Sequence, residues 1–282
     1  MLDTPRQQMQ TATFEIDLDA LRMLARAIPG ALPAALNGIR FAASIRPCKF
    51  VIDGGDDSPV TMPRTAYQLV YPDGKVMLDS GMDRATHESF GEGEPYDDDA
   101  FARILRALDA ARLIILTHYH ADHAGGVLTA AHSDELARKT IASTDTLSLM
   151  MAKPHRPHLK IDERQAAQFI ALDYRRYYPV APGLVLIKAP GHSPDMQMAY
   201  IRLQSGQEVL HSVDAAWVLD NIRQVKGNAA PWVKEDVPAV MAQLACLNAL
   251  IQRAPDLTIL VTHDDESFAS LSRAGVIGQL EV

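Results

Sequence analysis

The residues best suited to chemistry lie in one short segment, Thr117–His123, which has the sequence THYHADH. Three histidines and one aspartate fall within six residues there, at His118, His120, Asp122 and His123. Neutral imidazoles and carboxylates are ligands for zinc and similar ions. Crowding such groups together is unfavourable unless something binds them, because buried polar groups need partners. The segment therefore predicts a metal site.

Three further candidate ligands stand alone in the sequence, each just after an apolar run that we expect to form a strand. They are His192 in APGHSPD, Asp214 in HSVDAAW and His263 in VTHDDES. Taken alone, each would more often be an ordinary polar residue. Ligand sites in α/β sheets gather at the carboxyl ends of strands, and all four segments obey that rule. We therefore expect their side chains to meet.

The elements that must position these residues are short strands alternating with helices. Apolar, β-branched runs predict strands at Tyr67–Tyr71, Val76–Leu78, Leu113–Thr117, Leu184–Lys188, Met198–Leu203, Glu208–Val213 and Leu257–Thr262. Helical patterns cover Asp97–Asp109, Ser133–Lys139, Asp162–Tyr174 and Glu235–Ile251, and we expect a helix and turns over Leu21–Ala43. This mixture indicates a layered α/β domain.

A single domain over residues 1–282 is the simplest organisation, because no linker rich in Gly, Pro or Ser and no internal repeat occurs. About residues 1–60 form an N-terminal extension that we expect to pack on the domain. The basic, aromatic segment at about 150–178 lies between two ligand segments. Two interpretations remain open for it, a cap over the site or a solvated helix with a loop.

The composition limits the kinds of binding partner and the cellular locations that we expect for this chain. The net charge of −8 makes nucleic acid a poor default partner, and no apolar run of 18 or more residues predicts a membrane span. The N-terminus lacks the pattern of a signal peptide, and the two cysteines do not form a disulfide framework. We expect a cytoplasmic protein with a small-molecule substrate, and a homodimer is compatible with these observations.

The ligand pattern His118-x-His120-x-Asp122-His123, followed by His192, Asp214 and His263, resembles the metallo-β-lactamase superfamily. The resemblance spans roughly Tyr67 to Glu266 and includes the hairpin ending in LDSG at residues 78–81. It implies an α/β fold, a four-layer αββα sandwich with the site at one edge of the two sheets. It further implies a first metal on His118, His120 and His192, a second on Asp122, His123 and His263, and Asp214 as the bridge.

The chemistry implied is metal-assisted hydrolysis by two Zn²⁺ ions, with iron or manganese as alternatives. Two neighbouring cations lower the pKa of a shared water, so that a bridging hydroxide is available near neutral pH. Asp122 and Asp214 are the catalytic candidates, the first for proton transfer and the second as the bridge. Thr117, Asp79, Thr262 and Ser193 are candidates for orienting the imidazoles.

The ligand set also narrows the branch of the superfamily. The bridging aspartate resembles the lactonase, glyoxalase II and tRNase Z branches, and His120 stands where the flavodiiron oxidoreductases typically carry glutamate. The segment APGHSPDMQMAYI is similar to the PGHSPGHQ segment of N-acyl homoserine lactonases but departs from it at Asp195 and Met196. Those lactonases also carry a tyrosine where this chain has Trp217, and an indole cannot supply a phenol's acid/base function.

The leading hypothesis is a dinuclear zinc hydrolase that opens a lactone or a carboxylic ester. The alternatives are a glyoxalase II-like thioester hydrolase, a phosphodiester hydrolase, a mononuclear iron persulfide dioxygenase and a non-catalytic binding module. Complete retention of the ligand set argues against the last. Candidate substrate contacts are Tyr119, His155, His158 and Trp217.

Overall fold

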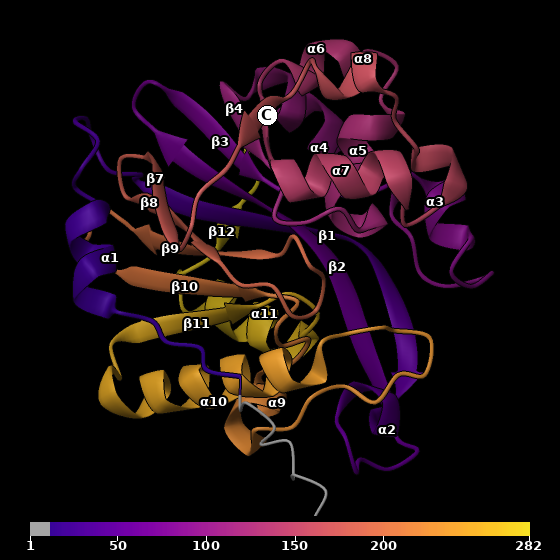
Figure 1. Ribbon diagram of the computed structural model, residues 1–282, viewed down its shortest axis with the longest axis vertical. Coiled ribbons are helices and arrows are strands. Elements are labelled where there is room, and N and C mark those ends of the chain that lie inside the picture. The colour runs from indigo at the N-terminus through magenta and orange to yellow at the C-terminus, as the bar shows by residue number, and fades with distance from the viewer. Residues whose placement is uncertain (1–11) are drawn as a thin grey trace, which may run out of the picture.

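Two β-sheets pack face to face in the computed structural model, which describes residues 12–282 (Figure 1). The larger sheet has the strand order β12-β1-β2-β3-β4-β5-β6, and the smaller one has the order β11-β10-β9-β8-β7. The larger sheet comprises β1 Ala35–Pro47, β2 Pro59–Tyr71, β3 Gly74–Leu78, β4 Leu113–Ile115, β5 Thr140–Ser143, β6 Ile170–Leu172 and β12 Gly278–Gln279. The smaller sheet comprises β7 Tyr177–Ala181, β8 Leu184–Lys188, β9 Gln197–Arg202, β10 Glu208–Val213 and β11 Leu257–Val261.

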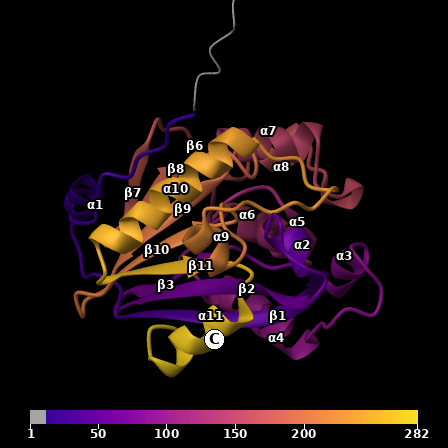
Figure 2. The same ribbon diagram turned by 90° about the horizontal axis from the view of Figure 1, so that it is seen from below.

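Most of the helices cover the outer face of one of the sheets, whereas Phe268 and Leu271, in the last helix, pack into the layer between the sheets. In chain order they are α1 Leu18–Leu24, α2 Cys48–Val51, α3 Arg84–Glu88, α4 Asp98–Ala110, α5 Ala121–Thr129, α6 Ser133–Ala137, α7 Thr144–Ala152, the 3-10 turn η1 Pro157–Leu159, α8 Glu163–Ala166, α9 Leu219–Gln224, α10 Val237–Arg253 and α11 Asp265–Arg273. Figure 2 shows α10 stacked over the smaller sheet, with the strands of the larger sheet beneath it. No helix of the described chain combines the length and apolar character that crossing a bilayer requires.

Three separate apolar layers make the fold a four-layer αββα sandwich, and a smaller apolar cluster packs α2 against Met62 and Trp217. One layer packs α4, α5 and α7 on the larger sheet, one fills the space between the sheets, and one packs α1 and α10 on the smaller sheet. In β8, Leu184 and Leu186 enter the middle layer whereas Val185 and Ile187 enter the outer one. Side chains alternate along a strand, so the two faces of β8 are buried in two different apolar layers. The predicted fold class is therefore confirmed.

The prediction of a helix and turns over Leu21–Ala43 is wrong for its second half. The helix α1 ends at Leu24, and β1 begins at Ala35 as a strand of the larger sheet. The run contains alanines and a glycine, which favour strands weakly, but pairing with β2 along its whole length overrides that preference. Residues 35–47 therefore belong to the sheet rather than to an extension packed on it; residues 1–11 of that predicted extension lie outside the described residues.

The predicted helix Asp162–Tyr174 is also wrong after its first turn. A capping box between Asp162 and Gln165 starts α8, but the helix ends at Ala166. The chain then forms β6, which pairs in parallel with β5 at the edge of the larger sheet. Edge pairing supplies the backbone hydrogen bonds that the longer helix would otherwise have made.

Candidate metal centre

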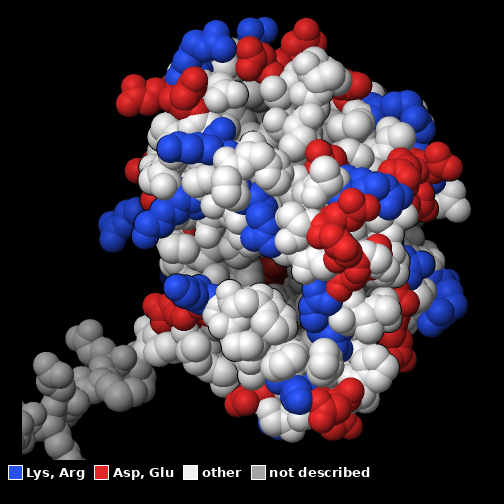
Figure 3. Space-filling model, turned by 90° about the vertical axis from the view of Figure 1, so that its right-hand side faces the viewer, with Lys and Arg blue, Asp and Glu red and all other residues white. Residues whose placement is uncertain are grey.

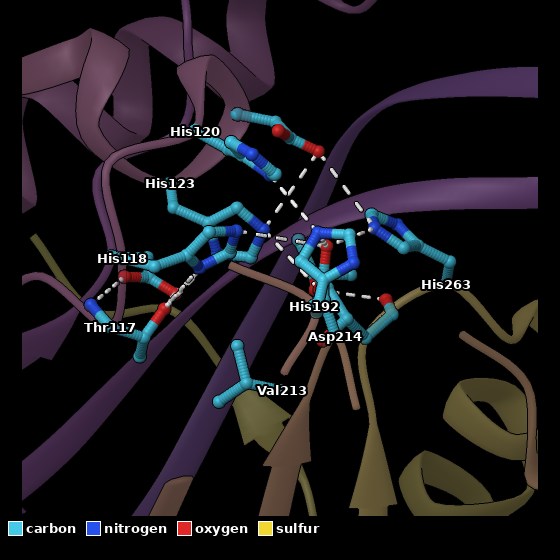
Figure 4. A network of polar contacts seen from close by, with 12 residues as sticks. Thr117, His118, His120, His123, His192, Val213, Asp214 and His263 are labelled. Atoms are coloured by element: carbon cyan, nitrogen blue, oxygen red, sulfur yellow. Dashed lines mark hydrogen bonds and ion pairs between the residues drawn. The ribbon is translucent and has the colours of Figure 1, made fainter. Parts of the chain in front are cut away.

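The candidate ligands follow four strands whose carboxyl ends meet at one edge of the sandwich. The THYHADH segment follows β4, His192 lies in the loop after β8, Asp214 follows β10, and His263 lies just after β11. The strands β8, β10 and β11 run in the same direction, because β9 is antiparallel to both of its neighbours and β10 is parallel to β11. Figure 4 shows the five imidazoles converging around Asp214, as the strand-end rule predicts.

A strained backbone turns Asp214 into the centre. The residue before it, Val213, has a φ of 51°, and the pairing of β10 with β11 shifts register between His211 and Val213. A positive φ is rare for a β-branched residue and persists only where the surroundings enforce it. Here the kink ends the strand, and the aspartate that follows contacts the ligand imidazoles.

The seven ligand side chains form two groups whose donor atoms lie within 4.8 Å of one another: His118, His120, His192 and Asp214 in one, and Asp122, His123 and His263 in the other. Asp214 contacts both groups. Its Oδ2 lies 3.3 Å from His192 Nε2 and 3.4 Å from His263 Nε2, and its Oδ1 lies 3.4 Å from His123 Nε2. The arrangement fits a two-metal site with Asp214 between the ions.

Three imidazoles are fixed through their Nδ1 atoms by an oxygen acceptor. His123 contacts Asp79 Oδ2 at 2.7 Å, His192 contacts Glu235 Oε1 at 2.5 Å, and His263 contacts the Pro63 carbonyl at 2.8 Å. A proton on each Nδ1 leaves the Nε2 lone pair aimed at the centre. This is the tautomer that metal ligation requires.

Several buried atoms that could bind a metal have no hydrogen-bond partner at the centre. His118 Nε2, His123 Nε2 and Asp214 Oδ1 make no hydrogen bond with the described chain, and His120 Nδ1 lies 3.0 Å from His192 Nε2. Two imidazole nitrogens at that separation need a proton or a cation between them. The donor set therefore fits bound cations, because orphaned buried polar atoms are otherwise unfavourable.

The electrostatics favour the ligand forms of His118, His120 and the two carboxylates. Burial, together with neighbouring imidazoles, holds the pKa of both His118 and His120 well below the usual range of histidine. Burial opposes ionisation of Asp122 and Asp214, but the adjacent imidazoles lower the pKa of each carboxyl below its usual value. Neutral imidazoles beside ionised carboxylates are the forms that coordinate a metal.

Burial lowers the pKa of His123 and His192, but acidic neighbours raise it by more. These neighbours are chiefly Asp214 and Asp79 for His123, and Glu235 for His192. A metal would therefore displace a proton from these two imidazoles.

Two of the four predicted orienting residues act as expected. Asp79 accepts hydrogen bonds from the Thr117 amide at 2.8 Å and from the Thr117 hydroxyl at 2.9 Å, and thereby ties the end of β3 to the ligand segment. Ser193 instead donates to Asp195, and the buried Thr262 hydroxyl has no partner in the described chain. The sequence analysis missed Glu235, which lies in the loop before α10 and far from His192 in sequence.

A cavity of about 730 Å³ opens above the ligands and is lined by three of the four predicted substrate contacts. Tyr119 packs on His120 with ring centroids 4.7 Å apart, His155 does so at 4.2 Å, and Trp217 lies 6.3 Å from the ring of His263. The structure does not bring His158 to this cavity. Its Nε2 instead hydrogen bonds with the Thr86 hydroxyl at 2.7 Å.

The segment at about 150–178 contributes only a short stretch to that cavity. Met150, Leu159 and Phe169 are buried in the layer between the helices and the larger sheet. Of this segment, His155 and Arg156 line the cavity. The structure thus places part of the predicted cap beside the ligands and the rest in the core.

Comparison with known proteins agrees with this geometry. Residues 61–196 match the metallo-beta-lactamase superfamily. The chain contains a metallo-beta-lactamase superfamily domain. The family resemblance inferred from the ligand pattern is therefore confirmed.

Among curated proteins, the chain is similar to an N-acyl homoserine lactonase of Bacillus thuringiensis, with 24% identity over 226 residues that cover 73% of this chain and 83% of the relative. An N-acyl homoserine lactonase of Rhizobium radiobacter is 23% identical over 249 residues, covering 78% and 89%. Among solved structures, an N-acyl homoserine lactone hydrolase with N-hexanoyl-L-homoserine at its catalytic metal centre superposes with a TM-score of 0.66 at 21% identity, covering 85% of this chain and 96% of that one. A dizinc quorum-quenching lactonase superposes with a TM-score of 0.55 at 13% identity, covering 82% and 91%. At these identities the structural likeness shows the shared fold.

Proposed function

We propose that this protein is a dinuclear zinc hydrolase that opens a lactone or a carboxylic ester. The observation that carries the proposal is the convergence of two ligand groups on Asp214, with buried donor atoms left free at their centre. His118, His120 and His192 would hold one ion, Asp122, His123 and His263 the other, and Asp214 would bridge them. When bound, such a pair lowers the pKa of a shared water and polarises a carbonyl oxygen.

The chain's own residues would bind and orient the substrate. His155 Nδ1 accepts a hydrogen bond from the Ala121 amide at 3.0 Å, and burial lowers the pKa of His155 to about 4. The imidazole is then neutral at pH 7 with its proton on Nε2, so it can donate to a substrate oxygen in the cavity. The indole N–H of Trp217 is a second donor beside the ligands. Neither group supplies the acidity of a phenol at neutral pH.

The relatives named above are lactonases, which supports lactone or ester hydrolysis and does not favour a thioester hydrolase or a mononuclear iron dioxygenase. The cavity supports a small-molecule substrate. A cytoplasmic location, the lack of nucleic-acid partners and a homodimer remain predictions from the sequence.

Elemental analysis followed by a substrate panel tests the proposal. We expect about two zinc ions per chain, and chelator-reversible hydrolysis of at least one lactone or carboxylic ester. The panel includes N-acyl homoserine lactones, unsubstituted lactones, nitrophenyl esters and a thioester. About one iron per chain, with oxygen uptake on a persulfide, would replace the hydrolase proposal with the dioxygenase.

A further inference from the structure

Arg64, on β2, lines the cavity above the ligands and lacks a negatively charged partner. It is only 8% exposed. Its guanidinium donates to the Ser44 hydroxyl at 3.0 Å and contacts the Met82 sulfur at 3.5 Å, and both partners are neutral. Within residues 12–282, no carboxylate oxygen lies within 4.0 Å of the Arg64 guanidinium nitrogens, the limit for an ion pair.

Asp122, Glu94 and Asp214 attract the Arg64 guanidinium from a distance, but none of them pairs with it directly. In the zinc-loaded protein Asp122 and Asp214 would be engaged by the metal, which would leave this buried cation without an anion of its own.

Another arginine of the same cavity, Arg46, has the ion pair that Arg64 lacks. Arg46 forms an ion pair with Glu94, and the Ser44 hydroxyl donates to the same carboxylate at 2.7 Å. Glu94 is thus engaged by Arg46 and Ser44, and Arg64 reaches it only through the serine. The charge of Arg64 remains available for an incoming group.

A second guanidinium contacts the same aromatic ring as Arg64. The Arg64 guanidinium carbon is 4.7 Å from the centroid of Phe90, and that of Arg156 is 3.6 Å from it. Arg156 donates to the Ser89 hydroxyl and to the His155 carbonyl, which are again neutral acceptors. Two cations on one ring repel each other, and an anion near them relieves that repulsion.

The charges that line the cavity favour an anion although the whole chain is acidic. Four cationic side chains line it, Arg46, Arg64, Arg156 and Lys234, against three carboxylates, Glu94, Asp122 and Asp214. Two divalent ions would make the cavity more positive still. Figure 3 shows this face of the molecule, with a hollow that has acidic atoms in its depth and Lys or Arg atoms near its rim.

We propose that Arg64 binds a carboxylate on the substrate, so that the preferred substrate of this hydrolase is an anionic ester or lactone. The planar guanidinium fork matches a carboxylate, and a buried contact of this kind confers specificity as well as affinity. This inference rests on the proposed hydrolase function, because it places the reacting carbonyl at the ligands and the second charge at Arg64.

A binding experiment on the zinc-loaded protein tests the inference without turnover. Calorimetry compares linear dicarboxylates from succinate to pimelate with monocarboxylates of the same carbon number. We expect at least one dicarboxylate to bind about 30-fold more tightly than its monocarboxylate. In Arg64→Met that ratio should fall below about threefold, with monocarboxylate binding unchanged. Arg40→Met, which removes an arginine already paired with Asp265 outside this cavity, is the control.

Stability separates a binding role from a structural one. If the cation is unfavourable in the free protein, Arg64→Met leaves the melting temperature unchanged or raises it. A clear fall in melting temperature would assign Arg64 a structural role and overturn the inference. If Arg64→Met does not fold, Arg64→Lys keeps the charge without the fork and should lower the dicarboxylate preference about tenfold.

Hydrolysis assays keep this inference distinct from the proposed function. Nitrophenyl butyrate and the nitrophenyl hemiester of glutarate report on neutral and anionic substrates, respectively. Hydrolysis of both with the same kcat/KM, together with no dicarboxylate preference at any length, would overturn the anion site and leave the hydrolase intact. Hydrolysis of no ester or lactone, with the Arg64-dependent preference retained, would overturn the proposed hydrolase and leave the anion site.

Discussion

Replacing Glu235 tests whether a residue remote in sequence prepares His192 to bind metal. The carboxylate is 6% exposed and lies 2.5 Å from His192 Nδ1. It fixes the proton on Nδ1 and keeps the Nε2 lone pair directed at the ligand centre. Without it, the imidazole can hold its proton on Nε2, which blocks coordination. Loss of such a supporting partner typically lowers metal affinity about 10- to 100-fold, or about 1.4–2.7 kcal/mol.

The assay is competition for zinc with a chromophoric chelator at pH 7.5, on folded protein checked by circular dichroism. We expect Glu235→Gln, which keeps a neutral acceptor, to weaken one zinc site about tenfold, and Glu235→Ala to weaken it towards 100-fold. Glu163→Gln, on the exposed first turn of α8, is the matched control. Zinc dissociation constants within twofold of wild type for both Glu235 variants would refute the reasoning.

Three further changes test the centre and its scaffold. Asp214→Ala removes the carboxylate that contacts both ligand groups and should lower zinc from about two ions per chain to one or fewer; unchanged metal content by elemental analysis would contradict the bridging role. Gly126→Ala would place a methyl group 2.0 Å from the Ser80 carbonyl oxygen, so we expect a loss of several kcal/mol in denaturant unfolding, and wild-type stability would show that α5 can shift. Partial burial raises the pKa of Glu208, but hydrogen bonds from Arg22 oppose this effect and contribute to a pKa below the usual value. The pair therefore stabilises the fold above the usual glutamate pKa and less as pH falls through the folded pKa. Arg22→Met should cost about 0.5–1 kcal/mol at pH 7 and progressively less below about pH 4, and a pH-independent difference would contradict the ion pair.

The amino-acid sequence by itself predicted which seven side chains meet at the candidate centre. Histidines and aspartates stand immediately after apolar runs, and strand ends in an α/β fold meet at one edge whatever the details of packing. A local pattern therefore predicted a meeting of side chains that are as far apart as His118 and His263. Local pattern also predicted most strands. The runs of β8, β10 and β11, for example, are apolar over lengths typical of buried strands.

The tertiary structure decided the features that depend on a distant partner. The run Ala35–Pro47 has weak strand preference, and only its pairing with β2 makes it a strand. The helix pattern after Asp162 ends early because β5 offers an edge for pairing. In each case, hydrogen bonds to another part of the chain outweigh a local preference of a few tenths of a kcal/mol per residue.

The same reason explains which site residues the sequence did not reveal. Glu235 lies in a loop without regular structure, and Arg64 lies in a strand where a single arginine has no distinguishing neighbours. Their roles come from burial and from their direct partners: an imidazole for Glu235, and only the neutral Ser44 hydroxyl and Met82 sulfur for Arg64. Side-chain type and spacing encode which groups can bind a metal, whereas burial and the absence of a counter-charge exist only once the chain has folded.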